Sequence, residues 1–440
     1  MKKTGKILLT GLLAVCTAFS LAACGGTGEM LSQGADQGIE QGVSESVGDY
    51  DDVVMYSMTD KEDVTIHIDT EEIQKVSFMF RVLDKRDYSF KNGELTVKSD
   101  VFEGQSAGDK TLRVFVDNLY FDITVRLVSK VIYTVEDFND IRNDLNGTYV
   151  LGADLDFENR AFWPIGKAYE AEADGSYATG AFEGVFDGNG HTISNITINA
   201  LDYAEGEDEN GQGPSLGAVV SNSRNYNNGI FMQTSANAQI LNTNFSNITV
   251  NCQGLGGAVV GMNGGLVKNC FVSCTLYSLG GAEHAAGIAG VNGSTDAPGR
   301  IENCLVVYGH GGGTTPRGIA DWNNGSITNC YAVTVDSYVF HPGYDSATGK
   351  IDPTFDINTY FDETNFNDAL YNNYTLIALP GSMNTTSWEF YPAGEGKITN
   401  SEIVRKEFML DPDNFPEEDG WDRSVWSFTA GDFPRLIVQD

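Results

Sequence analysis

Between Val53 and Lys130 the sequence is a series of short runs in which apolar and polar residues alternate. The runs are rich in β-branched and aromatic residues, and turn-forming residues separate them: VVMYSM, VTIHID, KVSFMF, ELTVKSDVF, TLRVFVDN and LYFDITVRLV. A period of two places successive side chains on opposite faces, so each run predicts a strand with one buried face. Six or seven such strands favour an antiparallel, immunoglobulin-like β-sandwich over residues 53–130.

The rest of the chain, residues 131–440, contains an internal repeat. Four short apolar runs share an asparagine at the same position, namely Asn242, Asn269, Asn303 and Asn329, at spacings of 27, 34 and 26 residues. A Gly-rich apolar segment precedes each run. Repeats of this length cannot bury their apolar face alone, and they are typical of solenoids.

A stack of short strands and tight turns explains these spacings, because equivalent strands of a solenoid lie about 4.8 Å apart. Inward positions would then form ladders of like residues, one of which is Ile240, Val267, Ile301 and Ile327. Asparagine tolerates the left-handed backbone conformation of a sharp corner, and its amide can bond to the asparagine of the next turn. The repeats therefore predict an all-β fold, a solenoid of short strands preceded by the small sandwich.

Five cysteines lie in the repeat region, and three of them directly follow the repeated asparagine: Cys270, Cys304 and Cys330. We interpret these three as a second inward ladder of small apolar side chains. An odd number of cysteines without a CxxC pair is a poor disulfide framework and a poor metal site. No metal ion is therefore expected.

The N-terminus has the pattern of an exported and anchored protein. Three lysines precede an apolar run, residues 7–21, which is too short to remain as a membrane-spanning helix. The sequence Leu-Ala-Ala-Cys24 resembles the bacterial lipobox, which implies that residues 1–23 are a lipoprotein signal peptide and that Cys24 carries a lipid. Residues 24–52 contain seven acidic residues and no basic one, which predicts a disordered acidic tether.

Several motifs resemble one family of bacterial surface proteins. The four repeats and the segment Phe182-Glu-Gly-Val-Phe-Asp-Gly-Asn-Gly-His are similar to GLUG-type repeats, which implies a right-handed parallel β-helix over residues 131–440. Tyr133-Thr-Val-Glu-Asp-Phe-Asn-Asp-Ile looks like the helical cap of that family, and Gly420-Trp-Asp-Arg-Ser-Val-Trp looks like its terminal closure. Residues 336–395 lack the repeat, and we interpret them as a decoration beside the β-helix.

The sandwich segment has a resemblance of its own. Tyr88-Ser-Phe-Lys-Asn-Gly-Glu-Leu-Thr-Val-Lys and Gly108-Asp-Lys-Thr-Leu-Arg-Val-Phe resemble the X2-type immunoglobulin-like modules of secreted polysaccharide-degrading systems. Those modules are spacers or weak binders of cell wall and sugar, so the resemblance implies no catalytic role here.

Composition and charge narrow the range of partners. The chain has 440 residues, with 27 Lys and Arg against 61 Asp and Glu, for a net charge of −34. Such a charge argues against nucleic acid, an anionic membrane surface and polyuronate substrates as partners. Glycine is abundant and proline is scarce, at 50 and 11 residues, as expected for many tight turns in a packed fold.

Enzymatic activity is the sharpest hypothesis, because parallel β-helices include pectin lyases and polygalacturonases. Asp187, Asn189 and His191 form a polar cluster, but the sequence DGNGH also suits a corner whose side chains bond to the backbone. Gly-His310-Gly followed by Arg317 is similar to polygalacturonase signatures, yet the repeat region lacks the paired Asp-Asp of those enzymes. We therefore expect that the protein is not an enzyme.

Two further groups of residues could bind a ligand. Acidic runs at 202–209 and 411–422 could hold Ca²⁺, but neither has the spacing of a known calcium loop, so no cofactor is expected. Aromatic residues of the decoration could form a stacking platform for sugar rings. Its candidate ligand-binding residues are Tyr371, Tyr374, Trp388 and Tyr391, with Tyr360 nearby. The same rings could equally form the decoration's own core.

Together these patterns predict a lipoprotein anchored in the cell membrane and exposed on the extracellular side of a bacterium. We expect it to be a non-catalytic binding or adhesion protein for a glycan or for another surface protein. The alternative is a polysaccharide-active hydrolase or lyase on a β-helix scaffold.

Overall fold

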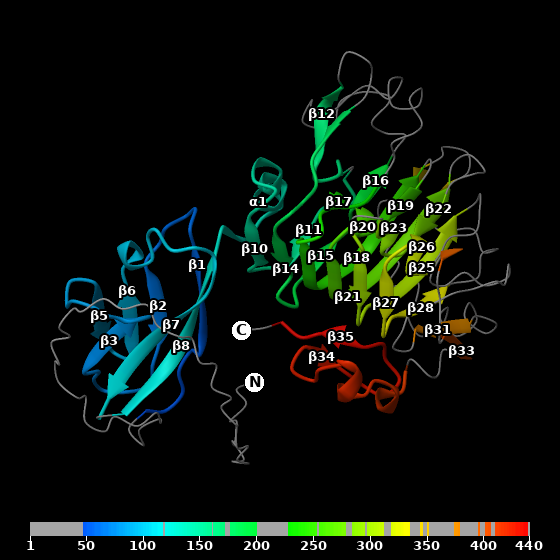
Figure 1. Ribbon diagram of the computed structural model, residues 1–440. Helices are drawn as coiled ribbons and strands as arrows, with labels where there is room; N and C mark the ends of the chain where they lie inside the picture. Colours follow the sequence, from blue (N-terminus) through cyan, green and yellow to red (C-terminus); the bar gives the residue numbers. More distant parts are fainter. Residues whose placement is uncertain are drawn as a thin grey trace, which may run out of the picture.

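The computed structural model is an all-β protein, with one short α-helix, α1 (Val135–Asn139), among the residues that it describes (Figure 1). The described residues are 47–117, 119–160, 162–171, 177–199, 228–252, 255–278, 284–294, 297–311, 318–334, 344–345, 350–351, 374–378, 395–396, 401–405 and 410–438. The predicted signal peptide, Cys24 and tether residues 24–46 lie outside them. Among the described helices, none is long and apolar enough to cross a membrane.

The N-terminal part of the described chain is a sandwich of two sheets. The first sheet has the order β1 (Val53–Ser57), β8 (Leu119–Val128), β7 (Gly108–Val116), β3 (Lys75–Phe78) and β4 (Arg81–Val82). The second has the order β2 (Val64–His67), β6 (Glu94–Val97) and β5 (Tyr88–Lys91). The alternating apolar residues fill one core between the sheets, where Ile66, Leu112 and Ile123 are fully buried. The predicted strands are present, but β1 pairs with β8 in parallel, whereas the sequence predicts only antiparallel pairs.

Two sheets of mainly parallel strands follow and enclose a second core. The main path of the larger sheet is β9 (Lys130–Ile132), β10 (Thr148–Leu151), β14 (Val185–Asp187), β18 (Gln239–Cys252), β21 (Leu266–Ser278), β25 (Leu305–Gly311), β28 (Tyr331–Thr334), β31 (Tyr374–Ala378) and β33 (Ser401–Arg405). Beside this path lie β11 (Leu155–Asp156), β15 (Thr192–Ser194), β16 (Thr197–Asn199), β24 (Arg300–Glu302) and β27 (Ser326–Thr328). The smaller sheet contains β17 (Phe231–Thr234), β20 (Val260–Asn263), β23 (Ala289–Asn292), β26 (Ala320–Asn323) and β32 (Glu395–Gly396).

Short two-stranded pairs complete the described strands. They are β12 (Lys167–Ala171) with β13 (Tyr177–Thr179), β19 (Leu255–Gly257) with β22 (His284–Ala286), β29 (Tyr344–Asp345) with β30 (Lys350–Ile351), and β34 (Trp426–Ser427) with β35 (Arg435–Leu436). Strand β31 comes from the segment predicted to be a decoration, and it extends the larger sheet by an antiparallel pairing with β28.

From β17 to β28 the chain alternates between the two sheets, as the spacing of the repeats predicts. The expected ladder is confirmed, because Ile240 pairs with Val267, Val267 with Ile301, and Ile301 with Ile327. All four side chains are fully buried. One strand position therefore faces the same core at each level.

The repeated asparagines occupy the corners. Asn242, Asn269, Asn303 and Asn329 all have a positive φ, between 46° and 52°. The amide of Asn269 donates a 2.9 Å bond to Oδ1 of Asn242, which confirms the predicted bond between turns. The amides of Asn303 and Asn329 instead donate to the backbone carbonyl oxygen of Asp419. At these two corners the segment around Asp419, which is distant in the sequence, therefore replaces the neighbouring asparagine as hydrogen-bond acceptor.

The three cysteines that follow these corners are buried and carry free thiols. The Sγ of Cys304 lies 3.2 Å from the carbonyl oxygen of Glu302, two residues earlier. Cys270 and Cys330 repeat this contact with Lys268 and Thr328, at 3.4 and 3.2 Å. Burial raises the pKa of the Cys304 and Cys330 thiols well above the usual range. Their predicted place in the core is thus confirmed.

The C-terminal segment, residues 410–438, packs on the outer face of the larger sheet. Phe415 and Trp421 pack on Tyr331, and the Arg435 guanidinium lies 3.8 Å above the Phe271 ring. From there the chain returns toward β14, below the green and yellow strands in Figure 1. The segment expected to form the terminal closure therefore covers the side of the parallel sheet, and we call it the C-terminal strap.

Candidate binding cleft between the sandwich and the parallel sheets

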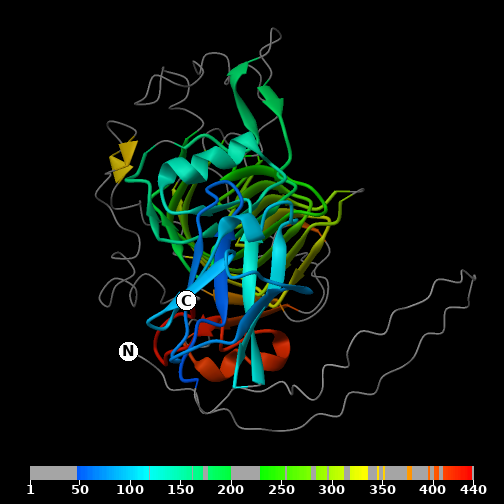
Figure 2. The same cartoon turned by 90° about the vertical axis from the view of Figure 1, so that its left-hand side faces the viewer.

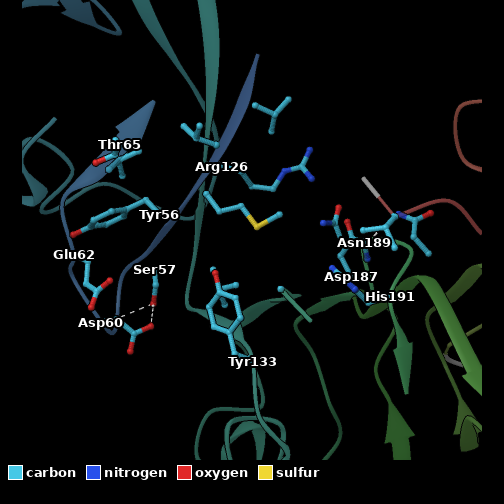
Figure 3. Close-up of a pocket in the computed structure, with 18 of the residues that line it drawn as sticks. Tyr56, Ser57, Asp60, Glu62, Thr65, Arg126, Tyr133, Asp187, Asn189 and His191 are labelled. Carbon is cyan, nitrogen blue, oxygen red and sulfur yellow. Dashed lines mark hydrogen bonds between the residues drawn. The ribbon is translucent and has the colours of Figure 1, made fainter. Parts of the chain in front are cut away.

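A cleft of about 860 Å³ separates the edge of the sandwich from the first strands of the larger sheet (Figure 3). Strand β1 and the turn after it form one wall, and the corner after β14 forms the other. Tyr133 and the end of the C-terminal strap complete the lining. Three segments that are distant in the sequence therefore meet at one place.

The two walls are held in a fixed relation by the chain that joins them. Strand β8 belongs to the sandwich, and β9 begins the larger sheet two residues after β8 ends. The amide of Ser129, between the two strands, donates to the carbonyl oxygen of Thr148 at 2.7 Å. Val128, Val131 and Val150 form a small buried cluster across this joint. Figure 2 looks from the sandwich toward the parallel strands that stack behind it.

The cap of the parallel sheets is also anchored at this joint. Helix α1 begins with a capping box, in which the Thr134 side chain accepts a bond from the Asp137 amide and the Asp137 side chain accepts one from the Thr134 amide. Lys130 forms a 2.5 Å ion pair with Asp137. Phe138 is fully buried, so the helix closes the core. The helix expected after Tyr133 is present.

The sandwich wall is acidic. Asp60 accepts a 2.5 Å bond from the hydroxyl of Ser57, and Asp63 accepts a 2.9 Å bond from the Ser99 amide. Asp52 and Glu62 also line this wall. The turn is tied to the joint, because Thr59 donates to the Ser129 carbonyl oxygen at 2.7 Å.

The opposite wall contains the polar cluster that the sequence singles out. Oδ1 of Asp187 accepts bonds from the Asn189 amide at 2.9 Å and from the Asn242 side chain at 3.0 Å. Asn189 has a φ of 51°, so it occupies a left-handed corner. The expected bonding of DGNGH to its own backbone is confirmed for Asp187.

His191 has a partner that the sequence analysis missed. Its Nδ1 lies 3.1 Å from Oδ1 of Asp154, which also accepts a 2.8 Å bond from the Thr192 amide. Asp154 comes from the loop before β11, 37 residues earlier in the chain. No local pattern links the two residues, since only the parallel pairing of β11 with β15 brings them together.

The rim of the cleft is apolar. The Tyr133 ring is 60% exposed, and Ile437 and Val438 of the C-terminal strap are 37% and 42% exposed. The strap passes so close to Gly190 that a Cβ there would overlap the Ile437 carbonyl oxygen. Glycine is therefore required at this corner if the strap is to reach the cleft.

Negative charge dominates the lining. Its carboxylates are Asp52, Asp60, Glu62, Asp63 and Asp187. Arg126 also lines the cleft, but its guanidinium bonds to both carboxylate oxygens of Asp109 at 2.9 and 3.4 Å. This bond raises the pKa of Arg126, and Asp187 adds to the effect. An anionic ligand would meet strong repulsion here.

The other candidate sites are only partly covered by the structure. Tyr371, Trp388, Tyr391 and the acidic run at 202–209 lie outside the described residues, and Tyr374 is the first residue of β31. His310 lies in β25, while Arg317 lies outside the described residues. Over the described ranges, including 411–422, no three His, Cys, Asp or Glu side chains group as a metal site would require. The aromatic platform stays a prediction.

Known proteins offer no direct guide to this cleft. Comparisons with protein families, with characterised proteins and with solved structures find no match to this chain. The function must therefore be argued from the geometry of the chain itself.

Proposed function

We propose that the protein is a surface lipoprotein of a bacterium, anchored through a lipid on Cys24, and that it binds a glycan without chemical turnover. In this proposal an immunoglobulin-like sandwich is followed by a right-handed parallel β-helix. The alternation of the chain between two parallel sheets and its left-handed asparagine corners support the β-helix.

The cleft is the ligand site in this proposal, and its lining is the observation that carries the proposal. Carboxylates accept hydrogen bonds from sugar hydroxyls, and side-chain amides can both accept bonds from them and donate bonds to them. An exposed aromatic ring offers a flat surface for the apolar face of a sugar. The cleft combines Asp187 and Asn189 with the exposed ring of Tyr133. Its volume of about 860 Å³ lies within the usual range for ligand sites.

The charge of the cleft selects among glycans. Five carboxylates line it, and the Arg126 guanidinium is already paired with Asp109. Uronates and sulfated sugars would be repelled, whereas neutral sugars carry no charge that these carboxylates would repel. The proposed ligand is therefore a neutral glycan.

A glycan array probed with the full chain tests this proposal. The Tyr133→Ala chain should lose most of the binding, because the ring supplies the stacking surface. The Trp322→Ala chain is the control, because Trp322 is also exposed, at 48%, but lies on the smaller sheet. Retention of full binding by Tyr133→Ala, or preferential binding of uronates, would refute the proposed site.

A hydrolase or lyase is the second candidate, and the Asp154–His191 pair is the observation that favours it. A carboxylate that orients an imidazole can make it a general base. A reducing-sugar release assay on the glycans that bind separates the two functions. Release that disappears in both His191→Ala and Asp154→Asn would establish the enzyme, and binding without release would support the non-catalytic role.

A further inference from the structure

The sandwich carries an apolar tip at the edge farthest from the cleft. Strands β3 and β4 form a hairpin, in which Phe78 pairs with Arg81 and only Met79 and Phe80 make the turn. Phe80 is 100% exposed, Val82 is 58% exposed and Met79 is 42% exposed. Since β1 and β4 are opposite ends of the first sheet, the tip and the cleft use different surfaces.

The turn is unusual in its residue types as well as in its exposure. Met79 has a φ of 52°, a left-handed conformation that hairpin turns of this length usually assign to Gly, Asn or Asp. Large apolar residues therefore occupy a turn in which small or polar residues would cause less backbone strain and expose less apolar surface to water. Neither the fold of the hairpin nor the core of the sandwich requires the Phe80 ring, because it contacts solvent on all sides.

The surroundings of the tip are basic in an otherwise acidic chain. Residues 75–91 contain five basic residues and two acidic ones, whereas the whole chain has a net charge of −34. The Arg81 and Arg86 side chains are 62% and 84% exposed; Arg81 pairs with Asp87 at 2.8 Å and Arg86 lies 3.6 Å from Asp84, so the segment keeps a net charge of +3. Charged residues at an edge strand commonly prevent association with other sheets, but an exposed Phe80 and Val82 would work against that purpose.

We infer that this hairpin docks on an anionic phospholipid bilayer, with Phe80 and Met79 in the interfacial region and the basic residues at the headgroups. Amphipathic elements with an aromatic tip and a basic rim bind such interfaces, through apolar burial and attraction to anionic lipids. The negative charge of the whole chain argues against broad contact with a bilayer, so contact is restricted to this tip. Docking through β4 leaves the cleft, at the β1 edge, open to the outside.

Site-specific fluorescence tests the inference in the full chain. Phe80→Trp is mixed with phosphatidylglycerol-containing vesicles whose acyl chains carry bromine, and the signal of the native chain is subtracted. Thr65→Trp is the matched control, because Thr65 is also exposed but lies on β2 of the second sheet and lines the cleft, which this docking leaves open to the outside. The N-terminus is identical in the two variants, so any difference in quenching reports the position of the probe.

We expect bromine to quench Phe80→Trp several-fold more strongly than Thr65→Trp. The difference should shrink in vesicles of phosphatidylcholine alone, and adding Arg86→Gln should reduce it in anionic vesicles. Equal quenching of the two variants would overturn the inference, as would a blue shift of Phe80→Trp without vesicles, which indicates pairing of two tips. Because no glycan takes part, the result is independent of the proposed ligand.

Discussion

The side-chain amide of Asn263 donates a 2.8 Å hydrogen bond to Oδ1 of Asn292, which lies 29 residues later at the end of the adjacent strand. Asn292 repeats the bond to Asn323 at 2.8 Å, and the Thr234 hydroxyl donates to Asn263 at 2.9 Å. All four residues are buried. A shift of one residue between neighbouring strands would break every one of these bonds, so the ladder fixes the register of the smaller sheet.

The substitution Asn292→Ala should lower the free energy of unfolding by about 2–3 kcal/mol, because it removes the bonds of a buried amide to Asn263, to Asn323 and to the Ser326 carbonyl oxygen. A denaturant titration of the full chain measures the change. Asn324→Ala is the control, since Asn324 is exposed beside the ladder and its removal should cost less than about 0.5 kcal/mol. Equal losses for the two variants would contradict a stabilising role for the ladder.

The path of the C-terminal strap leads to a prediction about Gly190. Gly190 and Gly431 both have a positive φ, of 81° and 90°, so alanine at either should cost about 1–2 kcal/mol in backbone strain. Only at Gly190 would the new Cβ overlap the Ile437 carbonyl oxygen; at Gly431 nothing lies within 4 Å. Gly190→Ala should therefore lose about 2 kcal/mol more than Gly431→Ala.

Thermal unfolding and limited proteolysis measure this difference. The Gly190→Ala chain should be cut more readily near Ile437, because the end of the strap is displaced from the corner. It should also bind glycan more weakly, since Ile437 and Val438 line the cleft. Identical proteolysis of the two variants would show that the strap tolerates a Cβ at Gly190.

The part of the fold that could be predicted from the sequence depends on local rules that repeat. Alternating polarity predicts the sandwich strands, and the Asn corners predict the Ile240–Val267 level of the larger sheet. The ladder through Asn263 was not predicted, because its asparagines belong to Gly-rich segments in which no alternation of polar and apolar residues indicates a strand. The position of the strap was not predicted either, since the bond from Asn303 to Asp419 spans 116 residues.

The candidate site was less predictable than the fold. The DGNGH corner stands out in the sequence, because polar residues cluster there at short range. The sandwich wall, Tyr133 and Asp154 have no such signal, since they reach the cleft only when the sandwich docks beside the first strands of the larger sheet. Tyr133 belongs to the segment predicted to form the cap, and only the folded structure reveals that its ring stays exposed.

Thiol labelling tests the buried cysteine row. Cys270, Cys304 and Cys330 are buried and free, and burial raises the pKa of the Cys304 and Cys330 thiols, which keeps them protonated. Peptide mapping after maleimide treatment should find these three cysteines unlabelled in the native chain and fully labelled in denaturant. A disulfide between any two of them in the native chain would contradict the structure.

The row also predicts which substitution it tolerates. Thr243 pairs with Cys270, and its hydroxyl donates to the carbonyl oxygen of Leu241, two residues earlier, at 2.6 Å. A hydroxyl can therefore replace the thiol contact at this corner. Cys304→Ser should cost about 1 kcal/mol, whereas Cys304→Leu should cost more than about 3 kcal/mol because the core has no room for it. Denaturant titrations of both variants compare the losses.

Tyr149 should make the protein sensitive to alkaline pH. Burial, with Asp144 and Asp140 nearby, raises the pKa of Tyr149 from 10.0 to about 12, and its hydroxyl donates to the Asp144 carbonyl oxygen at 2.6 Å. The unfolded chain releases this proton near pH 10, whereas the folded chain keeps it up to about pH 12. The contribution of Tyr149 to the free energy of unfolding is therefore complete below pH 10 and is lost as the pH rises through 12.

The Tyr149→Phe chain should show a shallower decline of the unfolding free energy over this interval. The Tyr133→Phe chain, in which the replaced ring is exposed, should decline in parallel with the native chain. Burial also raises the pKa of Tyr331, so part of the decline should persist in the Tyr149→Phe chain. If the unfolding free energy of that variant falls with pH as steeply as that of the native chain, Tyr149 ionises alike in the folded and unfolded states, which would contradict the prediction.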